Sequence, residues 1–194
     1  PEALTFTWSS RNMGTMIHAP PSSPHPLIAH PSCDICADWR VSVSVWRELE
    51  CDQINIRFVL PRSRIQWTEP RVTDTLPARV DELWKHSCVE LFIGTSGDQC
   101  YREFNFSLDG RWAAYDFSGY RERISDLPSI PAPKIFSEIS DDAVCLQVKL
   151  KGECLPCVGN LELNATAVLE TGSGSLSYWA ALHPCAQPDF HHRD

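Results

Sequence analysis

Hydrophobic and polar residues alternate one by one along much of this chain of 194 residues. The alternation is clear in segments 41–46, 54–58, 88–93 and 161–167. Successive side chains of a β-strand point to opposite faces of a sheet, so this period predicts strands with one buried and one polar face. About nine such segments, with turn signals roughly every 8–15 residues and no convincing helix, predict an all-β antiparallel sandwich or barrel.

The stretch 83–117 is the most regular part of this pattern. It reads as three successive strands joined by two turns that each contain glycine. Asp109-Gly110 marks the second of these turns and predicts a hairpin. Two other short connections, at 49–53 and at Asp141-Asp142, predict antiparallel hairpins in the same way.

Three segments interrupt the alternation. Residues 1–26 are rich in Pro, Ser and His, and we expect a flexible or artificially added arm there, followed by a single β-sandwich domain over 27–194. Segments 61–82 and 118–134 contain several prolines and predict long surface loops, whose length suggests a function. Trp67 in the first of these loops would either pack down as a lid or contact a ligand.

Charge and cysteine content narrow the classes of partner. The net charge of −8 argues against nucleic acid, because phosphate binding needs a basic face. No apolar run approaches the roughly 18–20 residues of a membrane span. The first residues lack the order of a signal peptide, although one already removed would leave no trace. The nine cysteines are an odd number and several lie within predicted strands, so we expect reduced thiols and a cytoplasmic location.

One set of polar residues falls on the same side of several predicted strands. If those strands lie next to one another, these residues line a single face that combines aromatic rings, carboxylates and amides. Such a face suits a sugar, whose C–H groups stack on an aromatic ring and whose hydroxyl groups form hydrogen bonds. A solvated outer face of a sandwich would produce the same pattern. The residues are His86, Glu90, Glu103, Asn105, Asn164, Thr166, Trp179 and His183.

Two other patterns could support chemistry. Cys33 and Cys36, like Cys154 and Cys157, have the spacing of a zinc knuckle, and four thiolates could bind Zn²⁺ if the two loops meet. Unrelated thiols are the simpler interpretation, because the gap between the pairs is long. Separately, Glu90 and Glu103 could form an acid–base couple for glycoside hydrolysis, but the sequence does not set their separation.

Three blocks of the chain together resemble the DOMON-like proteins related to family 9 carbohydrate-binding modules, and in particular a bacterial MurB-like subgroup. The blocks are LWKHSCVELFIG (83–94), YREFNFSLDGRWAAYDFSGYR (101–121) and LSYWAALHPCAQPDFHHRD (176–194). The resemblance implies a jelly-roll-like antiparallel β-sandwich with a ligand pocket on one sheet or at its edge. It implies a binding-face acid at Glu90 and, more loosely, sugar-stacking tryptophans at Trp84 and Trp179.

We therefore expect a non-catalytic module that binds a carbohydrate or similar polyol, with no nucleic-acid partner and no prediction of the oligomeric state. The expected ligand-binding residues are Trp84, His86, Glu90, Glu103, Asn105, Trp179 and His183. Some relatives bind haem, so a haem- or metal-binding module is an alternative, with His86, His183, His191 or His192 as axial ligands. A glycan-active enzyme that uses Glu90 and Glu103, and an interaction domain without a small ligand, are weaker alternatives.

Overall fold

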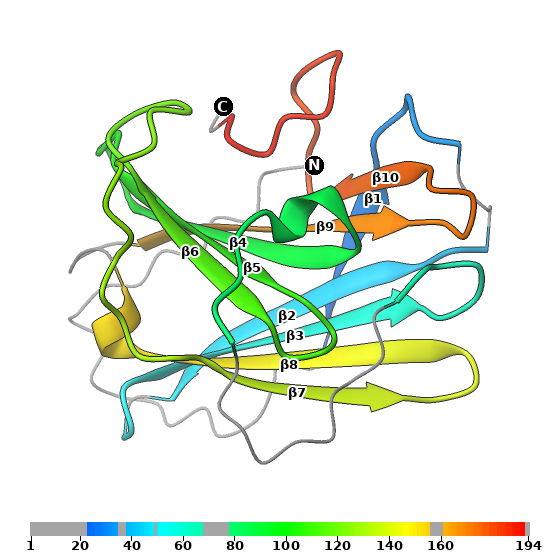
Figure 1. Ribbon diagram of the computed structural model, residues 1–194, viewed down its shortest axis with the longest axis horizontal. Coiled ribbons are helices and arrows are strands. Elements are labelled where there is room, and N and C mark those ends of the chain that lie inside the picture. Colours follow the sequence, from blue (N-terminus) through cyan, green and yellow to red (C-terminus); the bar gives the residue numbers. More distant parts are fainter. Residues whose placement is uncertain (1–22, 35–37, 49, 68–77, 156–160, 193–194) are drawn as a thin grey trace.

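The computed structural model describes residues 23–34, 38–48, 50–67, 78–155 and 161–192. In these residues ten antiparallel strands form two packed layers (Figure 1). No helix among them is long and apolar enough to cross a membrane. The elements are β1 (His25–Ala29), β2 (Val41–Glu48), β3 (Gln53–Pro61), the 3-10 turn η1 (Leu83–Lys85), β4 (Cys88–Thr95), β5 (Tyr101–Phe106), β6 (Trp112–Phe117), β7 (Lys134–Ile139), β8 (Ala143–Lys151), the 3-10 turn η2 (Gly152–Cys154), β9 (Leu161–Glu170) and β10 (Leu176–Ala180).

The hydrogen-bonded order of the strands is β6-β5-β4-β9-β10-β1-β2-β3-β8-β7. One layer, called here the upper layer, contains β6, β5, β4, β9 and β10, and the other contains β2, β3, β8 and β7 (Figure 1). β1 connects them, because Ile28 pairs with Ala180 of β10 while Leu27 pairs with Val41 of β2. This arrangement confirms the predicted antiparallel β-sandwich, with one strand more than the nine expected.

That additional strand is β1, which begins at His25. The last two residues of the predicted arm therefore pair with β2, while residues 1–22 lie outside the described part of the chain. β1 is short and contains Pro26, which explains why the alternation did not mark it as a strand.

The three predicted hairpins are confirmed. β2 pairs with β3, β5 with β6, and β7 with β8, all antiparallel. At the β5–β6 turn, the amide of Ser107 donates to the carbonyl of Arg111, and Gly110 has a φ of +85°. Side chains rarely allow that left-handed backbone, so the turn requires the glycine that marked it in the sequence.

The main core lies between the two layers. It consists of the apolar residues that occupy every second position of each strand and point inward. Its largest fully buried members include Ile56, Phe58, Leu91, Phe104 and Leu146. Among the described residues four tryptophans are buried, namely Trp39, Trp46, Trp112 and Trp179. Trp67, in the loop after β3, packs partly against the core, as a lid residue would.

A second apolar cluster lies on the outer face of the upper layer. It includes Phe92, Tyr101, Tyr115, Phe117 and Val168, all on the parity that points away from the main core. η1 and the C-terminal segment 183–192 pass over this face (Figure 1). The polar face of these strands is thus covered by other parts of the chain, and this covered face holds the candidate site.

The main core yields a stability prediction. Phe104→Ala removes a fully buried ring between the layers and leaves a cavity, so we expect the free energy of unfolding to fall by about 3–5 kcal/mol. Phe136→Ala is the matched control, because Phe136 on β7 is 50% exposed and should change stability far less. Urea unfolding followed by fluorescence measures both. Equal losses for the two variants would contradict the assignment of Phe104 to the core.

Candidate ligand-binding site

A pocket of about 500 Å³ opens on the outer face of the upper layer. Its floor contains Glu90 of β4, Glu103 of β5 and Val168 of β9. η1, the loop after β6 and the C-terminal segment supply most of its walls. The aromatic side chains that line it are Trp84, Tyr115, Phe117, Tyr178 and Phe190.

Strand register brings the polar floor residues together. Glu90 lies directly opposite Asn105 of β5 on one side and Thr166 of β9 on the other. Glu103 lies two residues from Asn105 along β5, and therefore on the same face. Polar residues from three neighbouring strands thus meet at one place, as the alternation predicted for Glu90, Glu103, Asn105 and Thr166.

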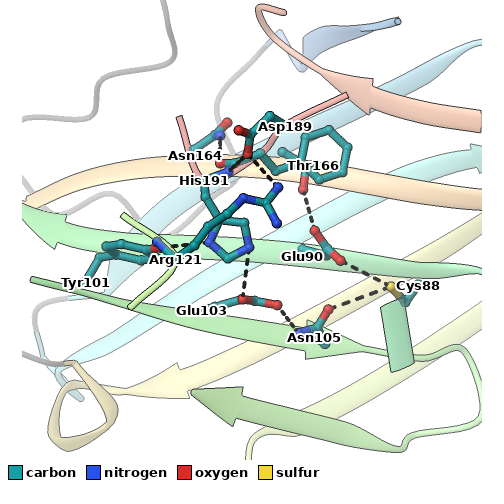
Figure 2. A network of polar contacts seen from close by, with 11 residues as sticks. Cys88, Glu90, Tyr101, Glu103, Asn105, Arg121, Asn164, Thr166, Asp189 and His191 are labelled. Carbon is teal, nitrogen blue, oxygen red and sulfur yellow. Dashed lines mark hydrogen bonds and ion pairs between the residues drawn. The ribbon is translucent and has the colours of Figure 1, made fainter. Parts of the chain in front are cut away.

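These groups form a hydrogen-bonded network beneath the pocket (Figure 2). The Thr166 hydroxyl donates to Glu90 Oε2 at 3.3 Å, and the Cys88 thiol lies 3.7 Å from Glu90 Oε1. Asn105 Nδ2 donates to Glu103 Oε1 at 2.6 Å. Glu90 is 3% exposed and Glu103 is 5% exposed, so both carboxyl groups are buried.

Burial changes the protonation of these carboxyl groups. Removal from water raises the pKa of Glu90 to about 8, and the neighbouring charge of Glu103 adds to the effect. Burial also raises the pKa of Glu103, although the hydrogen bond from Asn105 and the charges of Arg123 and Arg121 oppose this rise. At neutral pH Glu90 is therefore mainly a neutral acid, which can both donate and accept a hydrogen bond.

The C-terminal segment closes one side of the pocket through His191. Its ring packs edge-on against Phe92, Tyr101 and Phe117, with centroid distances of 5.2, 5.9 and 5.1 Å. His191 Nδ1 is 2.7 Å from the Tyr101 hydroxyl, which also accepts the backbone N–H of Arg121 at 3.3 Å. We assign the Tyr101 hydroxyl as the donor and His191 Nδ1 as the acceptor of this hydrogen bond. The imidazole proton of His191 is then on Nε2. That nitrogen faces Glu103 Oε2 at 3.8 Å (Figure 2).

His191 is neutral at physiological pH. Burial, together with the positive charge of Arg121, lowers the pKa of His191 to about 4. The histidine therefore acts as a neutral wall whose Nε2–H points toward the floor. The side chain of His191 is only 17% exposed, and its hydrogen bond with Tyr101 holds it in place.

Three cationic side chains, Lys85, Arg121 and Arg123, also line the pocket. Arg121 Nη2 is 2.8 Å from Asp189 Oδ1 in the C-terminal segment. The Arg123 guanidinium lies over the Tyr115 ring, 3.8 Å from its centroid. The pocket thus combines a carboxyl floor, aromatic walls and cationic groups.

Four predicted ligand-binding residues lie at the pocket or directly beneath it. Glu90, Glu103 and Trp84 line it, and Asn105 is bonded to Glu103. The Trp84 ring packs edge-on against Tyr115 at a centroid distance of 5.6 Å. The alternative of a solvated outer face does not apply to the two carboxyl groups, because both are buried.

The placement of Trp179 on the same face was wrong. Trp179 is 3% exposed and points into the main core, where its ring lies 6.5 Å from that of Trp39. Its indole N–H donates to the Ser177 hydroxyl at 3.0 Å, which satisfies its polar atom within the core. On β10 it is the opposite parity, with Tyr178, that faces the pocket.

The predicted histidines also lie elsewhere. His86 is exposed, with its Nδ1 2.9 Å from Glu170 Oε2, and His183 Nε2 donates to the carbonyl of Ile28 at 2.9 Å. Neither side chain lines the pocket. Conversely, Tyr115 and Tyr178 could have been found from strand parity, whereas Arg121, Arg123 and Phe190 lie in aperiodic segments that give no such signal.

The structure describes only two of the four cysteines that were predicted to bind zinc. Cys36 and Cys157 lie outside the described residues. Cys33 Sγ accepts the backbone N–H of Tyr178, and the Cys154 thiol donates to the carbonyl of Pro131. Within the described part of the chain, no three His, Cys, Asp or Glu residues are grouped to hold a metal ion. The zinc site and the haem alternative stay predictions.

Comparison with known proteins bears on the fold. No protein-family model matches the sequence, and no curated protein matches it. A solved protein from Bacteroides uniformis, provisionally described as carbohydrate-binding, aligns with a TM-score of 0.59 at 14% identity, over 88% of this chain and 82% of its own. A family 9 carbohydrate-binding module from Caldicellulosiruptor kristjanssonii, solved with cellotriose, aligns with a TM-score of 0.54 at 7% identity, over 81% and 71%.

The chain shares the fold of these proteins. At such low identity the likeness shows the β-sandwich and carries no site residue from one chain to another. The predicted relation to family 9 modules is supported at the level of architecture. The site itself must be argued from this chain's own residues.

The raised pKa of Glu90 predicts how stability depends on pH. Between the ordinary value of 4.5 and about 8, the folded state holds a proton on Glu90 that the unfolded state has lost. Glu90 therefore lowers stability as pH rises through this range, by at most about 1.4 kcal/mol per pH unit. Glu90→Gln keeps a neutral side chain of the same shape, so we expect it to be more stable relative to the native protein at pH 8 than at pH 5.

Urea unfolding at pH 5 and pH 8 measures this difference. Glu138→Gln on the exposed edge of β7 is the control, because the side chain there is in solvent and the same substitution should show little pH dependence. A stability difference for Glu90→Gln that is constant across the range would contradict a buried, neutral Glu90.

Proposed function

We propose that this protein is a non-catalytic carbohydrate-binding module, and that the pocket above Glu90 and Glu103 is its binding site. The proposal rests on one observation: two buried carboxyl groups lie on the floor of a pocket with aromatic walls. Strongly shifted titratable groups in a cleft are typical of functional sites. The shared fold with a family 9 module supports the same conclusion.

The chemistry of the pocket suits a sugar. Trp84, Tyr115 and Tyr178 present aromatic surface on which the C–H face of a pyranose can pack. Glu103 can accept a hydrogen bond from a hydroxyl group, and a neutral Glu90 can donate as well as accept. His191 Nε2–H lies 3.8 Å from Glu103, a gap that a hydroxyl group between them could bridge. The volume falls within the roughly 300–1,000 Å³ typical of small-molecule sites.

The two carboxyl groups also bear on the alternative of glycan hydrolysis. A glycosidase needs its two carboxyl groups to flank the scissile bond. Glu90 and Glu103 project from the same face of one sheet on neighbouring strands, an arrangement compatible with either role. We favour binding because the fold is shared with a carbohydrate-binding module. From the resemblance of the three sequence blocks, we also propose that the protein is a DOMON-like relative of family 9 modules.

The proposal predicts a measurable sugar affinity. Titration with glucose and cellotriose should change the tryptophan fluorescence, because Trp84 lines the pocket, and should give a heat signal by calorimetry. Glu103→Gln removes a charged acceptor, worth roughly 1.5–3 kcal/mol, and should weaken binding by about tenfold or more. Trp84→Ala should weaken it further and abolish the part of the fluorescence change that Trp84 reports.

His86→Ala is the control for this experiment. His86 lies close to Trp84 in sequence, but its side chain is 74% exposed and outside the pocket, so its replacement should leave the affinity unchanged. Circular dichroism checks that each variant is folded. Folded native protein that binds no sugar across a broad panel, uronic acids and sulfated sugars included, would overturn the proposal.

A further inference from the structure

We propose that the sugar recognised in this pocket is acidic: a hexuronic acid whose carboxylate is bound by Arg121 and Arg123. This inference rests on the proposed function and specifies the class of ligand. It follows from the charge of the walls, the hydrogen-bonding capacity of the lining groups and the anchoring of the loop that carries the arginines.

The lining of the pocket is unusually cationic for this chain. The protein has a net charge of −8, yet Lys85, Arg121 and Arg123 all line one pocket. The acidic residues that line it are the two floor groups, Glu90 and Glu103. The acids that contact the cations, namely Glu82, Asp81 and Asp189, are not among the lining residues. The cationic groups therefore line the pocket, whereas the acids that pair with them do not.

The lining also has more donors than acceptors. Arg and Lys can only donate hydrogen bonds, and His191 presents its Nε2–H to the interior. On the floor, Glu90 carries a proton at neutral pH and so adds one more donor. Glu103 is left as the main acceptor. Sugar hydroxyl groups both donate and accept, whereas a carboxylate only accepts, so a carboxylate on the sugar complements this excess of donors.

The two arginines lie on an anchored loop. The amide of Ser118 donates to the carbonyl of Glu122 at 3.0 Å. The amide of Ile124 donates to the carbonyl of Asp116 at 2.8 Å. Between these bonds, Arg121 adopts a left-handed backbone with a φ of 56°, and its N–H donates to the Tyr101 hydroxyl. A non-glycine residue in this conformation is uncommon and is found more often at functional sites.

The existing contacts of the arginines leave donors for a ligand. Arg121 contacts Asp189 through Nη2, and its guanidinium also lies 5.8 Å from the centroid of the Tyr120 ring. Figure 2 shows its side chain reaching across the site near His191. Arg123 lies 3.8 Å from Asp81, beyond hydrogen-bond distance, and its guanidinium stacks on Tyr115. A guanidinium has five N–H donors in a planar fork that matches a carboxylate, and partly exposed ion pairs such as these hold their partners weakly.

The test compares glucuronate and galacturonate with glucose and glucose 6-sulfate by calorimetry at pH 7. We expect one of the uronates to bind at least about tenfold more tightly than glucose. Raising the salt concentration from 50 to 500 mM should weaken uronate binding and leave glucose binding nearly unchanged, because screening acts on charges. The salt comparison uses the native protein and so does not depend on the folding of any variant.

Arg121→Gln and Arg123→Gln should each lower the ratio of uronate to glucose affinity toward one. Arg62→Gln is the matched control, because Arg62 binds the carbonyl of Ser140 outside the pocket and should keep the native ratio. Equal affinity for glucose and both uronates, or tighter binding of the sulfated sugar than of either uronate, would overturn the inference while sugar binding itself stands. If no sugar binds at all, the proposed function fails first.

Discussion

The contact between His191 and the outer face of the upper layer controls the whole site. Without it, β4, β5 and β6 would present Phe92, Tyr101, Glu103 and Phe117 on an open surface. The imidazole packs on three aromatic rings and accepts a hydrogen bond from Tyr101, and this pins the C-terminal segment across the sheet. The contact supplies one wall of the pocket and removes Glu103 from water. The raised pKa of the floor carboxyl groups depends on the same covering.

This covering comes at the expense of stability. A buried carboxyl group is unfavourable unless it is neutral or well bonded, and Glu90 meets the requirement by holding its proton. Asn105 would ordinarily be replaced by an apolar residue at a fully buried strand position, yet here it supports Glu103. Buried strand positions are ordinarily filled by apolar residues. Proteins keep buried polar groups at such positions mainly where function requires them.

The sequence predicted the strands well because their period is a local property. Parity correctly placed Glu90, Glu103, Asn105 and Thr166 on one face, and the hairpins followed from Gly110 and the short connections. Parity does not say which face is the core in a strand with apolar residues on both sides. In β10 both Tyr178 and Trp179 can be buried, and the polar neighbours Ser177 and His183 suggested the wrong side for Trp179. Trp179 pairs with Ala167 of β9, which is a core residue, and this pairing directs the Trp179 side chain into the core. The register between two strands cannot be read from the sequence of one of them.

The walls of the pocket were beyond sequence reasoning for a related reason. Arg121, Arg123, Phe190 and His191 lie in segments without periodicity, and only the folded chain brings 121–123 and 188–191 over the same strands. The β-sandwich is shared with proteins of 14% and 7% identity, so the sheets tolerate almost complete change of sequence. The walls of the pocket, in contrast, come mainly from η1, the loop after β6 and the C-terminal segment. Specificity can therefore diverge in these loops while the layers stay the same, and a likeness of fold to a cellotriose-binding module is compatible with a pocket whose cationic walls select a different sugar.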